Sequence, residues 1–215
     1  GFLLFLVMLQ PDMGTAIMIL LLSISMYFIA GQDLKYLLLL VPILSVGSIG
    51  LIMAAPYRLK RLTAFMNPSE DPLGVGFHIN QILISITEGG FVGRGFGESR
   101  QKYLFLPEAH TDSIFAIIGE EMGFIGSFFL ILLFMVLLYK LYEIFQHTTD
   151  RFGKLLLAGI FTYFGLQICI NLGGMVNLMP LTGVTLPFIS YGGSSMLTSF
   201  MMLGVAINIS RQSGR

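Results

Sequence analysis

The residues best suited to chemistry lie in the stretch LFLPEAHTDSIFAIIGEE, residues 104–121, which leads into a long apolar run. Three side chains there can accept or donate protons: Glu108, His110 and Asp112. Because Pro107 interrupts any preceding helix and Thr111 can cap a new one, we expect Asp112 in the first turn of a helix. Backbone N–H groups and the positive helix end favour an ionised carboxylate there. Asp112 could therefore serve as a catalytic carboxylate or simply complete the helix terminus.

The composition indicates that such chemistry takes place at a membrane. Hydrophobic residues make up 55% of the chain and charged residues 11%, and the mean hydropathy is +0.83. These values exceed those of ordinary soluble domains, and several apolar runs are long enough to cross lipid. Positive and negative residues balance at 12 each, and no basic cluster is interleaved with aromatic residues. The sequence predicts an integral membrane protein with no nucleic-acid partner.

The apolar runs predict an all-α fold, a polytopic membrane helix bundle in a single transmembrane domain over residues 1–215. The expected spans are about 1–10 (partial), 14–30, 34–55, 113–138, 155–175 and 193–210. Because the chain opens inside an apolar run without an initiating Met, we expect it to be a fragment that begins within a membrane helix.

Two irregular regions separate these spans. The loop over residues 56–111 is far longer than an ordinary connection, which is typical of functional loops. Within it, apolar residues recur at helical spacing over 79–86, which predicts a short helix lying in the membrane interface. Glycines crowd residues 89–97, where they allow either a close approach to a ligand or a hinge. The apolar stretch 177–192 is broken by Pro and Gly, which predicts a re-entrant segment beside a cavity.

The cationic residues suggest an orientation. Six lie in the long loop, and they are Arg58, Lys60, Arg61, Arg94, Arg100 and Lys102. Long loops count weakly in the positive-inside rule, so the short connections are expected to be cytoplasmic and the long loop extracytoplasmic. Cations on the outer face are not needed for orientation, and they are suited to binding a phosphate.

Four motifs together resemble one family. They are QPDMGT (10–15), RLKRLTAFMNPSEDPLG (58–74), LPEAHTDSIFAIIGEE (106–121) and PLTGVTLPFISYGGSS (180–195). In this order and membrane context the chain resembles the SEDS proteins, the FtsW/RodA/SpoVE-type peptidoglycan glycosyltransferases, over roughly the C-terminal half of the family. Ala109 and the PLTG stretch resemble the FtsW-like division and sporulation branch. Ser113 departs from the family pattern, in which an aromatic residue is more usual.

The resemblance implies a function and its partners. It implies polymerisation of lipid II, a disaccharide pentapeptide on undecaprenyl pyrophosphate, into β-1,4 glycan strands for cell division or cell-shape maintenance. It also implies a multi-pass protein of the bacterial cytoplasmic membrane with the long loop outside. Its expected partners are a class B penicillin-binding transpeptidase, divisome or elongasome proteins and membrane lipids. Asp112 is the implied catalytic residue, as a general base or as a possible ligand of a divalent cation, Mg or Mn.

Other residues are candidates for binding substrate, each with a simpler alternative. Glu108 could position the acceptor or a cation, or be an exposed loop carboxylate, and His110 could equally be a hydrogen-bonded structural residue. Arg58, Arg61 and Lys102 are candidates for the diphosphate, although attraction to lipid headgroups would also explain them. Asp12 could complete the cavity or pair with a cation, or be a turn residue after Pro11.

Two further acids, Glu120 and Glu121, follow Asp112 within the apolar run. On one straight helix they would lie about 12–14 Å beyond Asp112, inside the apolar core. Acids there are functional candidates, or they pair with cations on spans outside this sequence.

Two rival functions fit the same sequence pattern. One is a transporter, or flippase, of a lipid-linked precursor, because broken helices around polar residues also build transporters. The other is a non-catalytic membrane scaffold of the cell-wall machinery.

Overall fold

The computed structural model describes residues 7, 12–33, 35, 61, 63–67, 74–101 and 106–213. Its described part is all helical and contains no strand, which confirms the predicted fold class. The elements are α2 (Met13–Ile29), α5 (Val75–Gly89), α6 (Ile114–His147), α7 (Arg151–Met175) and α8 (Gly193–Gln212). The expected spans at 1–10 and 34–55 lie outside the described residues, apart from residues 7 and 35.

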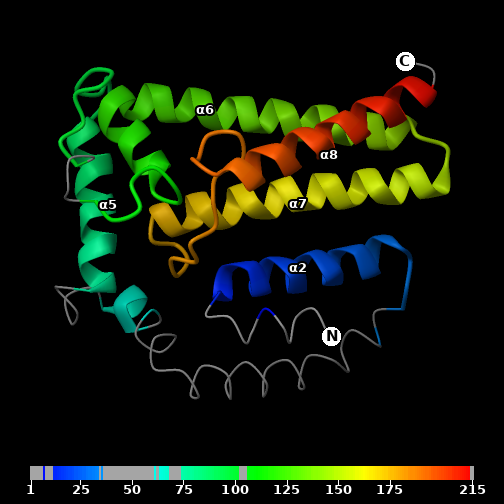
Figure 1. The fold of residues 1–215 in the computed structure, drawn as a ribbon, viewed down its shortest axis with the longest axis horizontal. Helices are drawn as coiled ribbons and strands as arrows, with labels where there is room; N and C mark the ends of the chain where they lie inside the picture. The colour runs from blue at the N-terminus through cyan, green and yellow to red at the C-terminus, as the bar shows by residue number, and fades with distance from the viewer. Residues whose placement is uncertain are drawn as a thin grey trace.

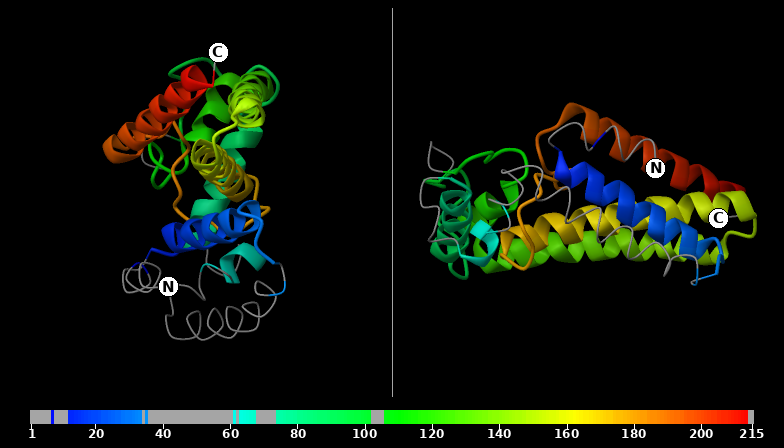
Figure 2. Two further views of the ribbon diagram at one scale, coloured as in Figure 1. Left: turned by 90° about the vertical axis from the view of Figure 1, so that its right-hand side faces the viewer. Right: turned by 90° about the horizontal axis from the view of Figure 1, so that it is seen from below.

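The long helices run lengthwise beside one another, and α5 runs crosswise at one end of them (Figure 1). Helix α7 packs against α2, α5, α6 and α8, so it is the centre of the described bundle (Figure 2). Three helices, α6, α7 and α8, are long and apolar enough to cross a membrane, and α2 is a shorter apolar helix. The crosswise α5 agrees with a helix that lies along an interface rather than spanning it.

Local sequence explains where two of these helices begin. The Asp12 carboxylate accepts hydrogen bonds from the Thr15 backbone N–H at 3.0 Å and the Thr15 hydroxyl at 2.6 Å. At the start of α7, the Asp150 carboxylate accepts the Gly153 N–H at 2.6 Å. Each carboxylate satisfies an N–H group that would otherwise lack a partner in the first turn. Asp12, a candidate for substrate binding, thus acts as the N-cap of α2.

Helix α6 is not straight, because Gly123 leaves the helical conformation with φ of 65° and ψ of −163°. The N–H groups of Phe124 and Ile125 turn outward and donate to the carbonyls of Gly90 and Phe91, at 2.9 and 3.1 Å. In return the N–H groups of Arg94 and Gly95 donate to the carbonyls of Glu120 and Glu121, each at 3.0 Å. The backbone on both sides of the kink is therefore hydrogen-bonded to the backbone of the glycine-rich stretch.

Only glycine fits where the loop meets the kink, because a side chain would have no space there. A Cβ on Gly93 would lie 2.2 Å from the Glu121 carbonyl oxygen, and one on Gly123 would lie 2.3 Å from the Gly93 nitrogen. The glycine-rich stretch thus approaches the protein's own backbone closely, in place of the ligand approach or hinge considered above. Gly123 faces this loop, and a Cβ on Gly126 would meet the Met122 side chain of its own helix.

The apolar spacing over 79–86 is confirmed as a helix, α5. Ile79 and Ile82 are buried at 3% and 1% exposure and join the core with Phe115 and Ala116 of α6. Ser85, which the pattern assigns to the polar face, is fully buried and donates to the Ala116 carbonyl at 2.9 Å. This exception occurs because α5 packs on α6 across part of its polar face as well.

The segment between α7 and α8 is irregular over residues 176–192. It folds back beside α7 and is held there by side chains of that helix, since the Gln167 amide donates to the Thr185 carbonyl at 2.9 Å. Nearer the end of α7, the Asn171 amide donates to the Val184 carbonyl at 2.7 Å. Buried amide side chains thus satisfy backbone carbonyls that no helix satisfies.

Candidate active site

The turn that carries the acidic motif delays the start of α6. Glu108 adopts a positive φ of 49°, and its carbonyl accepts the N–H groups of both Thr111 and Ser113 at 3.2 Å. Because this turn occupies residues 108–113, α6 begins at Ile114 after an N-cap, Ser113, whose side chain makes no capping bond. The expectation that Thr111 caps the helix and Asp112 occupies its first turn is therefore wrong.

Asp112 lies at the centre of contacts from three elements. Its side chain is 9% exposed and accepts the Thr111 hydroxyl at 3.2 Å. Its backbone carbonyl accepts the Asn171 amide of α7 at 2.8 Å. The imidazole Nε2 of His78, on α5, lies 2.8 Å from the hydroxyl of the adjacent Ser113. Helices α5 and α7 and the acidic turn together fix the position of this carboxylate.

Burial dominates the electrostatics of this pair. It raises the pKa of the Asp112 carboxyl above its usual range, although His78 and the hydrogen bonds act in the opposite direction. Burial also lowers the pKa of the His78 imidazole, against the attraction of Asp112 and Glu108. A carboxylate with a raised pKa is a stronger base than one held at a helix N-terminus, and perturbed groups of this kind gather at functional sites.

Two other candidates lie near this pair. The Glu108 carboxylate accepts the Thr111 hydroxyl at 2.8 Å, so one hydroxyl lies within hydrogen-bonding distance of both Glu108 and Asp112. Arg61 donates to the Leu181 carbonyl at 3.3 Å, and its charge acts on His78. Two carboxylates, an imidazole and a guanidinium thus converge here. Arg58 and Lys102 lie outside the described residues.

His110 and Asp12 have different surroundings. The exposed His110 borders a separate cavity of about 590 Å³ beside Tyr191 and Ile189. Its carbonyl accepts the Tyr191 N–H at 2.8 Å, which ties the acidic turn to the irregular segment. Asp12 is occupied as the α2 cap described above. The Asp12 side chain thus has a structural role as a cap, and a binding role for the His110 side chain stays a prediction.

Glu120 is enclosed by the glycine-rich stretch. Its side chain is fully buried and accepts the Ser99 hydroxyl at 2.6 Å, the Arg100 N–H at 2.9 Å and the Ser85 hydroxyl at 3.3 Å. The Arg94 guanidinium lies 3.7 Å away and also pairs with Glu88 at 2.9 Å. Glu120 therefore finds its cation within this chain rather than on a missing span.

The depth of Glu120 and Glu121 within the apolar core stays a prediction, because the kink of α6 at Gly123 lies beyond both acids. The helix begins two residues after Asp112 and bends at Gly123, and the loop folds over its first part. Glu121 lies at the same junction, where its carboxylate accepts the Ser99 N–H at 3.4 Å. Both acids therefore belong to the contact between α6 and the loop.

The donor set does not form a closed metal cage. Over the described ranges, no three His, Cys, Asp or Glu side chains are grouped as metal ligands. Mg²⁺ usually binds through one or two carboxylates together with substrate phosphates. Asp112 and Glu108, which share the Thr111 hydroxyl, fit that second arrangement.

Sequence reasoning missed three residues of this site. The sequence predictions do not single out His78 in the loop 56–111, Asn171 in the span 155–175 or Gly183 in the stretch 177–192. Gly183 has a φ of 75°, and a Cβ there would lie 3.8 Å from the Asp112 carboxylate. The one available signal was polarity, because Asn171 is an amide on an apolar helix and the unusual Ser113 requires a polar partner such as His78.

Comparisons with known proteins agree with these features. The family model FTSW_RODA_SPOVE, described as "Cell cycle protein", matches residues 2–215. Stage V sporulation protein E of Bacillus subtilis is 46% identical over 207 residues, which cover 96% of this chain and 57% of that protein. A probable peptidoglycan glycosyltransferase FtsW of Trichlorobacter lovleyi is 42% identical over 201 residues, covering 94% and 53%. The chain thus spans just over half the length of these relatives.

Solved structures share the fold. A structure described as "Structural coordination of polymerization and crosslinking by a peptidoglycan synthase complex" matches 99% of this chain and 60% of its own, with a TM-score of 0.77 and 27% identity. The rod shape determining protein RodA of Thermus thermophilus matches 99% and 54%, with a TM-score of 0.62 and 28% identity. From the match over residues 2–215, the shared helical fold and the three helices able to cross a membrane, we conclude that this chain is a multi-pass membrane protein belonging to the FtsW/RodA/SpoVE family of cell cycle proteins.

Proposed function

We propose that this chain carries the catalytic carboxylate of a peptidoglycan glycosyltransferase that polymerises lipid II into β-1,4 glycan strands. The relatives named as probable peptidoglycan glycosyltransferases support the reaction class. The observation that carries the proposal is the Asp112 carboxylate, which is 9% exposed and fixed by contacts from α5, α7 and the acidic turn.

Asp112 is suited to be a general base. Glycosyl transfer requires a sugar hydroxyl of the acceptor to lose its proton as its oxygen attacks the anomeric carbon of the donor. In the proposed step the carboxylate takes that proton, a C–O bond forms at the anomeric carbon, and the bond to the diphosphate breaks. The diphosphate leaves with the electron pair. A single displacement inverts the anomeric centre, as in inverting glycosidases, and converts an α-linked donor into a β-linked product.

The neighbouring charges are assigned supporting roles. Arg61 would balance the negative diphosphate, together with Arg58 and Lys102, because a guanidinium or ammonium binds phosphate oxygens well. Glu108 would help to place the acceptor. Asp112 and Glu108 are the residues that would hold a divalent cation shared with the substrate, and such an ion would neutralise charge on the leaving group.

The location and partners follow from the same proposal. We place the long loop on the extracytoplasmic side, where the polymer is needed. The related peptidoglycan synthase complex couples polymerisation with crosslinking, which supports a penicillin-binding transpeptidase as the partner of this protein.

The test is polymer formation from purified lipid II by the full-length protein with its transpeptidase, comparing wild type with Asp112→Asn. The variant should lose about 10³-fold in rate or more, because general base catalysis supplies 10²–10⁴-fold. Asp150→Asn is the matched control, since it preserves the cap of α7 at the far end of the bundle and should polymerise normally. Inhibition by a chelator, reversed by Mg²⁺ or Mn²⁺, would support the cation.

The rival functions predict different results. A transporter of lipid-linked precursor should still move lipid II across vesicles when Asp112 is replaced, and a scaffold should tolerate the change altogether. Equal polymer from wild type and Asp112→Asn would remove Asp112 from the mechanism.

A further inference from the structure

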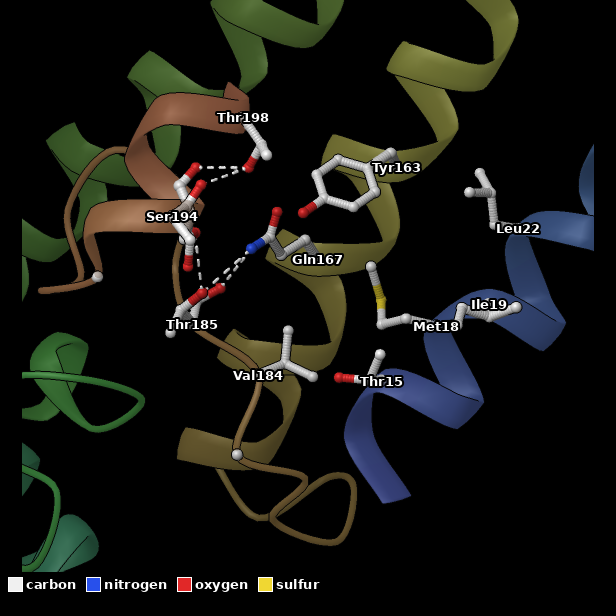
Figure 3. A pocket seen from close by; sticks show the side chains of 13 residues that line it. Thr15, Met18, Ile19, Leu22, Tyr163, Gln167, Val184, Thr185, Ser194 and Thr198 are labelled. Carbon is white, nitrogen blue, oxygen red and sulfur yellow. Dashed lines mark hydrogen bonds between the residues drawn. The ribbon is translucent and has the colours of Figure 1, made fainter. Parts of the chain in front are cut away.

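A pocket of about 440 Å³ lies between α2, α7, α8 and the irregular segment. Figure 3 shows it with Met18, Ile19 and Leu22 of α2 along one side. The opposite side carries side chains from α7, the irregular segment and α8. The pocket therefore has one mainly apolar wall, to which Thr15 of α2 adds a hydroxyl, and one mainly polar wall.

The polar wall is built of hydroxyl and amide groups. Its members are Tyr163, Gln167, Thr185, Ser194, Ser195 and Thr198. Among the described residues that line the pocket, none is charged. Among these described lining residues a diphosphate would find no cation, and a hydrocarbon chain would strip water from polar groups without replacing their hydrogen bonds.

One polar group on this wall lacks a partner. Gln167 is 3% exposed, and its amide nitrogen donates to the Thr185 carbonyl at 2.9 Å and hydroxyl at 3.3 Å (Figure 3). Its side-chain oxygen has no hydrogen-bond partner among the described residues. Buried acceptors are nearly always satisfied, so this oxygen calls for a donor beyond the described residues, and a ligand in the pocket is one source of it.

The pocket shares a wall with the proposed catalytic carboxylate. Gly183 and Val184 border the pocket, and they also border the narrow space beside Asp112. A Cβ on Gly183 would lie 3.8 Å from an Asp112 carboxylate oxygen, so this residue of the pocket wall also lies close to the carboxylate. Asn171 holds the wall in place through its bonds to the carbonyls of Asp112 and Val184.

We infer that this pocket binds a sugar ring of the substrate, through hydroxyl and acetamido groups that hydrogen-bond to Gln167 and the neighbouring hydroxyls. The inference rests on the proposed function and identifies which part of lipid II the pocket takes. A neutral ring with polar edges and an apolar face matches both walls, whereas the diphosphate and the prenyl chain match neither as well. A sugar ring held there lies beside Gly183 and Val184, which also border the space next to Asp112.

The experiment uses the full-length protein with its transpeptidase and the variant Gln167→Met, which keeps the length of the side chain and removes the amide. The KM for lipid II should rise about 3–10-fold, the range expected for one lost hydrogen bond. The inhibition constant of undecaprenyl pyrophosphate, which carries no sugar, should not change. Cys169→Ala is the matched control on α7, since Cys169 borders a different cavity and should behave as wild type.

Two results would overturn the inference: an unchanged KM, or equal weakening of lipid II and undecaprenyl pyrophosphate. Thr198→Val, which removes a hydroxyl and keeps the shape, provides the same test if Gln167→Met does not fold. If wild type forms no polymer, the proposed function fails. The inference is then judged by direct binding, because loss of affinity for lipid II alone supports it and parallel loss for both lipids overturns it.

Discussion

Asp112 and Glu120 are two buried acids eight residues apart at the same end of α6, yet their surroundings differ. Asp112 is 9% exposed, accepts the Thr111 hydroxyl, and has a carboxyl pKa raised by burial. Glu120 is fully buried and accepts two hydroxyls and two backbone N–H groups, with the Arg94 guanidinium nearby. Burial alone therefore does not identify a catalytic acid.

The two carboxylates differ in how many hydrogen bonds the protein donates to them. The lone pairs of Glu120 are taken up by Ser85, Ser99 and the backbone of the loop, so it holds α5, α6 and the loop together. Asp112 is held mainly through its backbone and its neighbours, which leaves its carboxylate able to take up a proton. The first arrangement supports the structure, and the second suits chemistry.

The largest expected effect on stability comes from Glu120→Gln. The change removes the buried charge that Arg94 faces and places amide hydrogens against existing donors, so unfolding should become easier by about 3 kcal/mol. A thermal unfolding scan of the purified protein in detergent measures this.

Asp112→Asn is the matched comparison. Because the pKa of the folded Asp112 carboxyl is raised, the stabilisation from its protonated form is present below the unfolded pKa and is lost as pH rises through the folded pKa. At neutral pH the ionised carboxylate thus opposes folding, and Asp112→Asn should not lower the melting temperature. Equal destabilisation by both variants would remove the distinction between the two acids.

A smaller effect is expected at the glycine-rich stretch. Gly93 and Gly97 have nearly the same φ, 85° and 87°, but a Cβ on Gly93 would clash with the Glu121 carbonyl, whereas one on Gly97 meets nothing within 4 Å. Gly97→Ala should cost about 1 kcal/mol from backbone conformation alone. Gly93→Ala should cost about 1 kcal/mol more through the clash. Urea or thermal unfolding of the two variants measures the difference, and equal losses would show that the loop does not pack tightly on α6.

The smallest effect is expected at His78. Removing the imidazole in His78→Ala leaves the buried Ser113 hydroxyl unpaired and should lower kcat/KM about tenfold, while His78→Gln can keep the hydrogen bond and should lose less. Because His78 lowers the pKa of the Asp112 carboxyl, both variants should move the acidic limb of the kcat/KM profile to higher pH. A merely structural role would leave that limb in place, so the pH profile separates positioning from folding.

Part of the fold could be predicted because its signals are local. The apolar runs over 14–30, 155–175 and 193–210 lie close to α2, α7 and α8, since membrane-spanning length and hydrophobicity are properties of single segments. The helix over 79–86 was predictable from its spacing for the same reason. The run over 113–138 also predicts the start of α6 to within one residue, but its kink at Gly123 was not predictable, because it depends on hydrogen bonds to the distant backbone of Gly90 and Phe91.

The residues of the candidate site also differ in whether the sequence could indicate them. The motif indicated Asp112 and Glu108 directly, because the residues of one turn are necessarily neighbours. His78 and Asn171 come from positions 34 residues before and 59 residues after Asp112, and only packing of α5 and α7 against the turn brings them there. A local sequence pattern cannot predict a contact between residues so far apart in the chain.

By itself the sequence determined that this protein is a helical membrane protein with an acidic motif at the start of a long apolar segment. Composition and periodicity are properties of single segments, so they do not depend on how distant parts of the chain pack. Only the tertiary structure decided that Glu120 is surrounded by donors and holds the loop, whereas the Asp112 carboxylate receives only the Thr111 hydroxyl among the described side-chain contacts. Asp112 and Glu120 are chemically alike in the sequence, and the difference between them comes from donors that lie elsewhere in the chain and reach one carboxylate far more fully than the other.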